Sequence, residues 1–360
     1  MKLLILTQKV SIDDDVLGFM HRWITEFAQH VQIVTVICLH AERYELSTNV
    51  RVISMGKEQI ANSKWQMAVR KFIYVFRFFY YIWRERHHYD TVFVHMNHEY
   101  VVMAGLLWRI MGKRVALWYA HGYVPWTLYI AKLFVHDIFT STTSGFRLST
   151  KKLHVVGQGI DTDQFQPTTR PLQQGVFTII SVGRISPVKD YATLIRAAAM
   201  LRDQGKQFQI MVIGQLGLVG QGQYLDQLRL QIGDFHLESV VHFIGAVPNR
   251  EIPGRLVTAD LFVNMSRTGS LDKAMLEAMA CGLPLATCNE SMHEVLGSYV
   301  GQLMYPGGDA RALTDKIAMV MDMSIAVRKQ LGVALRAIVV RDHDLRGFIK
   351  KIVQILSTRS

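Results

Sequence analysis

The sequence predicts an α/β protein made of two doubly wound, Rossmann-like parallel-sheet domains, and two observations carry that prediction. Short β-branched and apolar runs alternate with longer helical segments along both halves of the chain, which is typical of βαβ units. The chain has 360 residues, more than a single hydrophobic core usually organises, so we expect two domains.

The expected strands fall into two series, separated by a polar segment that contains Gly and Pro. The first series covers residues 3–6, 31–37, 50–53, 91–94, 114–119 and 138–142. The second covers residues 177–182, 208–213, 240–244, 261–265 and 283–287. Residues 157–171 between them are typical of a linker. We therefore expect an N-terminal domain at 1–168 and a C-terminal domain at 172–341.

The end of the chain predicts one more helix after the strands of the second domain are complete. Between residues 344 and 355, apolar side chains recur at helical spacing at Leu345, Phe348, Ile349, Ile352 and Ile355. Such an amphipathic helix must pack on a core, and we expect it to cover about residues 342–360.

The amino-acid composition limits the cellular compartment and the binding partners that we expect for this protein. The three cysteines form no C-x-x-C pair, which favours a reducing, cytoplasmic environment and no structural zinc. No apolar run approaches the roughly 20 residues of a membrane-spanning helix, and the first residues are too short for a signal peptide. The formal charge of +11 favours anionic partners, but no nucleic-acid-binding module is present, so nucleic acid is not expected.

Two cations flank the loop that follows the expected strand 177–182. Arg184 comes directly after Gly183, and Lys189 precedes a helical segment at 191–201. An Arg offers a planar fork of donors and a Lys a point charge, so together they can neutralise a diphosphate. Two solvated surface cations are the alternative interpretation.

A polar glycine loop follows the expected strand 261–265 and leads into a helix that carries Glu277. The backbone N–H groups near Gly269, and the positive end of the helix, would face the carboxyl edge of the sheet, where α/β proteins bind phosphates. We expect the N–H groups of Ser270 and Leu271 to be free for a ligand. Glu277 is placed to accept hydrogen bonds from ribose hydroxyls, or else it only stabilises the start of its helix.

The first domain offers candidate residues at the ends of two strands. His121 follows the strand 114–119 and can orient a hydroxyl group, although a structural role is the alternative. Asp13, Asp15 and Gly18 lie in the loop after the first strand, where we expect an acceptor-binding wall. Helix capping or acceptor contact explains the acidic residues better than a metal site, so no metal is expected.

Residues 64–88 are dense in aromatic side chains, and Arg70, Arg77 and Arg84 recur every seven residues on one helical face. This pattern suits an interfacial helix on an anionic membrane. The alternative is an outer helix of the first domain, with its aromatic residues packed on the sheet and its arginines in water.

Several motifs occur in the order found in one enzyme family. Gly183-Arg184 with Lys189 comes first, then Gly214, Gly245 and Val247, and then Glu277 with the following Ala-Met-Ala-Cys-Gly-Leu-Pro. Glu294 and a glycine-rich run up to Asp309 complete the series. This order resembles the family 4 glycosyltransferases over essentially the whole second domain.

The resemblance implies the GT-B fold, with two facing Rossmann-like domains, a cleft between them and a C-terminal helix that returns to the first domain. It also implies a retaining, metal-independent transfer from a nucleotide sugar. Arg184 and Lys189 would hold the diphosphate, Glu277 the ribose, and the region of Gly245 and Val247 the base. His121 would lie near the reacting carbon.

One position departs from the family pattern. The family has a glutamate eight residues before the one matched by Glu277, and this chain has Gly269 there. Asp272 is the replacement carboxylate that we expect to contact the donor sugar.

We therefore predict a glycosyltransferase that moves a hexose from a UDP- or GDP-linked sugar to a lipid, lipid-linked or cell-surface glycan acceptor. It would use no cofactor and work in the cytoplasm, with membrane contact through residues 64–88. A catalytically weak or inactive nucleotide-sugar-binding module and a nucleotide-sugar epimerase are the alternatives.

Overall fold

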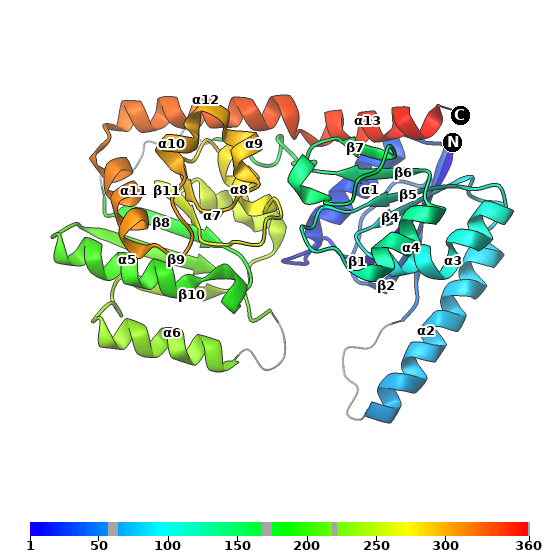
Figure 1. The fold of residues 1–360 in the computed structure, drawn as a ribbon, viewed down its shortest axis with the longest axis horizontal. Coiled ribbons are helices and arrows are strands. Elements are labelled where there is room, and N and C mark those ends of the chain that lie inside the picture. Colours follow the sequence, from blue (N-terminus) through cyan, green and yellow to red (C-terminus); the bar gives the residue numbers. More distant parts are fainter. Residues whose placement is uncertain (57–63, 168–174, 218–221, 359–360) are drawn as a thin grey trace. The chain divides into compact units, whose positions relative to one another are not determined.

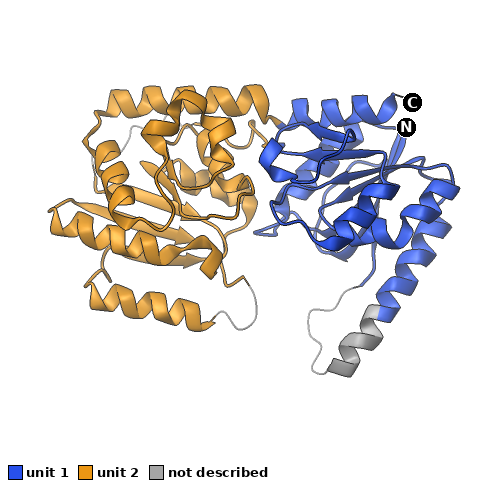
Figure 2. Ribbon diagram, in the orientation of Figure 1, with its two compact units in different colours: residues 1–159, 345–360 blue, residues 160–344 orange. Residues whose placement is uncertain are grey.

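The computed structural model describes residues 1–56, 64–167, 175–217 and 222–358. The chain forms two compact units (Figure 2). Unit 1 comprises Met1–Gly159 with Leu345–Ser360, and unit 2 comprises Ile160–Asp344. Residues 160–167 of the expected linker thus belong with unit 2. The domain boundary expected between residues 168 and 172 lies outside the described residues.

In the described part of unit 1, seven parallel strands form one sheet in the order β3-β2-β1-β4-β5-β6-β7 (Figure 1). They are β1 (Lys2–Val10), β2 (Ile33–Ala41), β3 (Val50–Ser54), β4 (Thr91–His95), β5 (Arg114–Trp118), β6 (Asp137–Thr140) and β7 (Leu153–Val155). Along β1, Leu3 and Ile5 enter one core, whereas Leu4 and Leu6 enter the other. Both faces of the sheet are therefore covered, as parallel sheets require.

Helices cover the two faces of this sheet. Helices α1 (Gly18–His30) and α13 (Leu345–Ser357) lie on one face, and α2 (Lys64–Arg84), α3 (Glu99–Ile110) and α4 (Trp126–Phe134) lie on the other, with η1 (Thr143–Gly145) after β6. Phe348 of α13 packs on Trp23 of α1, with ring centroids 4.4 Å apart. The C-terminal helix therefore belongs to the first domain, as predicted.

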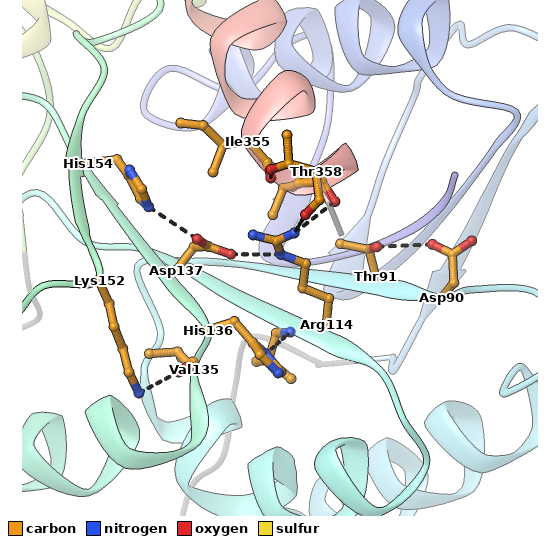
Figure 3. A network of polar contacts seen from close by, with 12 residues as sticks. Asp90, Thr91, Arg114, Val135, His136, Asp137, Lys152, His154, Ile355 and Thr358 are labelled. Atoms are coloured by element: carbon orange, nitrogen blue, oxygen red, sulfur yellow. Dashed lines mark hydrogen bonds and ion pairs between the residues drawn. The ribbon is translucent and has the colours of Figure 1, made fainter. Parts of the chain in front are cut away.

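A polar network ties the amino ends of β5, β6 and β7 to the end of α13 (Figure 3). Asp137 accepts a hydrogen bond from Nε of Arg114 at 2.8 Å and contacts Nε2 of His154 at 3.1 Å. The guanidinium of Arg114 also donates to the carbonyl oxygen of Thr358, just beyond α13. A cation at a helix C-terminus is stabilising, so this network anchors the last helix at the edge of the sheet formed by the amino ends of β5, β6 and β7.

In the described part of unit 2, five parallel strands form a sheet in the order β10-β9-β8-β11-β12. They are β8 (Phe177–Val182), β9 (Phe208–Ile213), β10 (Val241–Gly245), β11 (Leu261–Asn264) and β12 (Leu285–Thr287). All eleven strands expected from the sequence are confirmed. The additional strand β7 was not expected, because three residues, all at least partly exposed, carry no alternating pattern.

The helices of unit 2 also form two layers. One face is covered by α5 (Tyr191–Asp203), α6 (Gly222–Asp234) and α11 (Ala310–Asp322). The other is covered by α7 (Ile252–Leu256), α8 (Lys273–Ala280), α9 (Met292–Leu296), α10 (Val300–Leu303) and α12 (Ile325–Asp342). Three 3-10 turns join these elements: η2 (Pro187–Lys189), η3 (Asn249–Glu251) and η4 (Gly297–Tyr299). No helix in the described parts of the chain is long and apolar enough to cross a bilayer.

Candidate functional site

The strand order of unit 2 reverses between β8 and β11, which are adjacent parallel strands. The connection from β8 leads outward through α5 to β9, and β11 begins the opposite side of the sheet. Open α/β sheets bind ligands outside the carboxyl ends of the strands at such a reversal. The two loops that the sequence singled out, after β8 and after β11, are the loops that flank this point.

The loop after β8 begins with an unusually close approach of two strand ends. A Cβ atom on Gly214, after β9, would lie 2.1 Å from the carbonyl oxygen of Gly183, so glycine is required there. Arg184 follows and is exposed, and among the described residues it makes no hydrogen bond or ion pair. Its guanidinium is therefore available to an anion. Lys189 ends η2 at the far side of the loop.

The glycine loop after β11 is held by residues that follow β12. Ser291 Oγ donates to the carbonyl oxygen of Gly269 at 2.5 Å, and Nδ2 of Asn289 donates to that of Ser270 at 2.9 Å. Gly269 itself has φ of 66°, a left-handed conformation that favours glycine. These contacts order the loop before any ligand binds. The sequence does not indicate the roles of Asn289 and Ser291, because neither residue belongs to the loop.

The expectation that the N–H groups of Ser270 and Leu271 are both free is wrong for Ser270. Its N–H donates to Oγ1 of Thr268 at 3.4 Å, a turn within the loop that the sequence analysis overlooked. The N–H of Leu271 has no partner among the described residues, although its side chain is buried in the core. Leu271 therefore provides the available backbone donor.

Lys189 and Asp272, which the sequence analysis assigned to different parts of the donor, form an ion pair across the two loops. Asn264, the last residue of β11, donates from Nδ2 to the same carboxylate oxygen at 3.0 Å. Asp272 occupies the N-cap position of α8, yet its side chain makes no capping bond because it faces Lys189. Asp272 thus holds the ammonium of Lys189 at the strand reversal, and Asn264 in turn fixes the carboxylate of Asp272.

Glu277 lies in α8 and is only 4 % exposed. Asn249, at the start of η3, donates from Nδ2 to its Oε1 at 3.3 Å. Burial raises the pKa of Glu277 above its ordinary value, although Lys273, one turn earlier, opposes the rise. Burial likewise lowers the pKa of Lys273 against the opposing carboxylates of Glu277 and Asp161. A desolvated carboxylate of this kind gains strongly from hydroxyl donors.

Gly245 and Val247 lie at the end of β10, beside β9. The carbonyl oxygen of Gly245 accepts from the N–H of Gly214 at 2.8 Å, and Gly245 has φ of 87°. Val247 is buried in the core that contains α7 and α8. A ligand at this strand end would therefore meet the backbone of Val247, whereas its side chain supports α8.

In unit 1, His121 is partly buried in the loop between β5 and α4. Its Nδ1 accepts a hydrogen bond from the N–H of Tyr123 at 2.9 Å. Burial lowers the pKa of His121, so the ring is neutral at neutral pH and carries its proton on Nε2. Met96 at the end of β4 has φ of 61°, and its Sδ accepts from the N–H of Ala120 at 3.4 Å. This strained residue beside His121 was not anticipated.

The loop before α1 is organised by Asp14, which the sequence analysis did not single out. Its carboxylate accepts from the N–H groups of Val16 and Leu17 and pairs with Lys9 at 2.7 Å. Burial would raise the pKa of Asp14, but Lys9 and the two N–H groups lower it. Asp13 N–H donates to Oγ of Ser11, Asp15 is half-buried, and Gly18 is buried at the start of α1.

The acidic residues named above lie in both units, and they do not form a recognisable metal site. Within the described ranges, no three His, Cys, Asp or Glu side chains cluster as metal ligands would. Metal independence itself stays a prediction.

The family comparison matches the half of the chain that contains the candidate donor residues. Residues 162–336 match the model of the glycosyl transferases group 1. The putative colanic acid biosynthesis glycosyltransferase WcaL of Escherichia coli K12 is 28% identical over 191 residues, 51% of this chain and 46% of that relative. The amylovoran biosynthesis glycosyltransferase AmsK of Erwinia amylovora is 32% identical over 170 residues, 45% of this chain and 40% of the relative. The chain spans about half the length of the curated relatives it matches.

Solved structures share the fold over the full chain. Anabaena Alr3699/HepE, in complex with UDP and glucose, has a TM-score of 0.79 at 18% identity and covers 100% of both chains. The sucrose-phosphate synthase of Thermosynechococcus elongatus has a TM-score of 0.78 at 15% identity and covers 99% of this chain and 98% of its own. The fold is therefore GT-B. The match to the group 1 glycosyl transferases covers residues 162–336, which include every candidate donor residue described above.

Proposed function

We propose that this protein is a retaining glycosyltransferase that moves a hexose from a UDP- or GDP-linked sugar to an acceptor hydroxyl. One observation carries the proposal. At the strand reversal of unit 2, the ion pair of Lys189 and Asp272 joins two loops beside the available guanidinium of Arg184. The names of the relatives WcaL and AmsK support an acceptor in glycan biosynthesis, and the UDP complex of HepE supports UDP as the first nucleotide to test.

The proposed donor contacts follow the chemistry of each residue. Arg184 and Lys189 hold the diphosphate, which also contacts the N–H of Leu271 and the N-terminal end of α8. Glu277 accepts hydrogen bonds from the ribose hydroxyls. In transfer, the bond from the sugar carbon to the diphosphate breaks, the bond to the acceptor oxygen forms, and the acceptor proton passes to the departing phosphate. The cations stabilise the charge that develops on the leaving group, so the proposal needs no metal.

His121 is proposed to donate from Nε2–H to a sugar or acceptor oxygen and so to orient it. We expect His121→Ala to lower kcat about tenfold, the value of one lost hydrogen bond, while nucleotide affinity stays unchanged. His121→Gln, whose amide places a donor near the position of Nε2, should recover most of that loss. Equal loss in both variants would assign His121 a purely structural role. Steady-state kinetics at saturating donor measures the effect.

The first test of the function is a thermal-unfolding panel with UDP, GDP, ADP and their sugar conjugates. A ligand that binds only the native state raises the melting temperature, so one nucleotide should give a selective increase. If none of these ligands raises the melting temperature, the proposal is overturned. The matching nucleotide sugar then enters a transfer assay. A transferase releases nucleoside diphosphate in the presence of acceptor, an inactive binding module releases none, and an epimerase converts the sugar without releasing it.

The acceptor is proposed to be a lipid, a lipid-linked glycan or a cell-surface glycan, met at the cytoplasmic face of a membrane. A reducing compartment fits the free, buried cysteines Cys38, Cys281 and Cys288. Peripheral membrane contact through residues 64–88 is part of this proposal, and cell fractionation that finds the protein away from membranes would contradict it.

A further inference from the structure

Helices α2, α3 and α4 form one layer on the sheet of unit 1 (Figure 1). Phe78 of α2 packs on Tyr100 of α3, with ring centroids 5.0 Å apart. Helix α4 packs closely on the other side of α3, because a Cβ atom on Gly105 would stand 2.5 Å from Cβ of Phe134. The outer sides of the three helices therefore belong to one continuous surface, which we call the outer helical face.

This face exposes an apolar stripe on α2. Side chains of α2 are described from Phe72 onward, so Arg70 of the expected interfacial pattern lies outside that part. Phe72, Phe76, Tyr80 and Trp83 follow each other at spacings of four and three and are all exposed, Phe72 by 75%. Phe78 and Ile82, on the opposite side, are buried. The helix thus uses one aromatic side for packing and leaves the other in solvent.

The same arrangement recurs on the two neighbouring helices, where the sequence had not suggested it. Met103, Leu106 and Ile110 form an exposed stripe on α3, with Ile110 exposed by 75%. Trp126, Tyr129 and Leu133 form one on α4 at the same spacing, with Trp126 exposed by 71%. On each helix the stripe lies opposite the residues buried on the sheet. Exposed apolar side chains that gather on neighbouring helices are typical of an interaction site.

The charges on the outer helical face favour an anionic lipid bilayer over a second copy of the chain. Helices α2 and α4 contain basic residues and no Asp or Glu, and α3 has Glu99 as its one acidic residue. The guanidinium groups of Arg84 and Arg86 lie over the rings of Tyr81 and Trp83, at 4.9 and 4.5 Å from the ring centroids. Aromatic side chains flanked by cations suit the headgroup region of a membrane, whereas two such faces would repel each other.

We propose that the outer helical face docks on an anionic bilayer, with the stripes of α2, α3 and α4 entering the interface together. The α4 stripe begins five residues after His121, and Tyr123 between them is 68% exposed. Docking therefore brings the His121 loop to the membrane surface, where a lipid-linked acceptor would be presented. This last step rests on the proposed function, whereas the docking itself does not.

The test is co-sedimentation of the 360-residue chain with vesicles of phosphatidylglycerol and phosphatidylcholine. The wild type should bind these vesicles, bind weakly to pure phosphatidylcholine and lose binding as salt rises. Ile110→Ser and Leu133→Ser should each weaken binding about 5- to 10-fold, because each removes an inserted side chain. Leu230→Ser on α6 of unit 2, a residue 68% exposed, is the matched control and should bind as the wild type.

Three results would overturn docking on lipid. The first is that the wild type does not sediment with the vesicles. The second is that the α6 control loses as much binding as the α3 and α4 variants. The third is that light scattering detects a dimer which Ile110→Ser converts to a monomer. The last result would assign the face to a second copy. Vesicle binding requires no nucleotide. The thermal-unfolding panel with nucleotides therefore tests the proposed function separately from membrane docking. Unchanged melting temperatures confirm that the variants are folded.

Discussion

Replacing Lys189 by alanine should lower kcat/KM for the nucleotide sugar about 100- to 1,000-fold, the cost of removing one group that stabilises a developing negative charge. Lys189→Ala also leaves the carboxylate of Asp272, its ion-pair partner, facing the diphosphate. Arg184→Ala removes a cation without exposing an acid, so we expect a smaller loss. The second substitution Asp272→Asn should therefore restore part of the activity of Lys189→Ala.

Unit 2 provides a matched control in Lys206, which pairs with Asp322 at 2.5 Å on the surface. Lys206→Ala removes a lysine of a Lys–Asp pair outside the strand reversal and should keep wild-type kinetics. The donor assignment is wrong if Arg184→Ala and Lys189→Ala both behave like Lys206→Ala. Isothermal titration with the nucleoside diphosphate separates lost binding from lost turnover.

Replacing Glu277 by glutamine should weaken nucleoside diphosphate binding about 10- to 100-fold, because hydroxyl donors bind a charged acceptor more strongly than an amide. The loss should vanish for the 2′,3′-dideoxynucleotide, which offers no ribose hydroxyl. Burial raises the pKa of Glu277, so its carboxylate ionises later than an ordinary glutamate. Affinity of the wild type should then rise with pH above the ordinary glutamate range, and more steeply than that of Glu277→Gln.

Glu251→Gln is the control for this series, since Glu251 lies in η3 two residues after Asn249 and is exposed. It should leave both affinity and its pH dependence unchanged. The ionisation of the nucleotide is common to all variants, so only a difference between wild type and Glu277→Gln reports on the protein. Equal pH profiles for these two would remove Glu277 from the ribose site.

Much of the fold could be predicted because strands of parallel sheets are continuous apolar runs. Leu3 to Leu6 alternate between two buried faces, and the recurrence of such runs predicted every strand but β7. The helical spacing of Leu345, Phe348 and Ile352 likewise predicted α13, and these three residues are buried in unit 1. Local periodicity is enough for such elements, because each one buries a single repeating pattern.

The candidate site was less predictable, because its contacts join residues far apart in the chain. Asp272 was expected to meet the donor sugar, and the structure pairs it with Lys189, 83 residues away. Asn249 beside Glu277, and Asn289 and Ser291 behind the glycine loop, carry no local signal. Asn249 follows β10, whereas Asn289 and Ser291 follow β12, so only the order of the strands in the sheet brings these side chains together with the residues after β8 and β11.

Helix α2 also shows how local sequence and tertiary structure each determine part of the result. Its sequence was compatible with packing on the sheet and with an interfacial role. The structure buries Phe78 on the sheet and leaves Phe76 exposed, so the packing is confirmed and the interfacial role stays a prediction. The sequence by itself determined the two parallel sheets, the last helix and the residue types at the strand ends, because apolar periodicity and turn chemistry are local. The tertiary structure decided which charges pair and which apolar sides stay in solvent, because both depend on the neighbours that the strand order supplies.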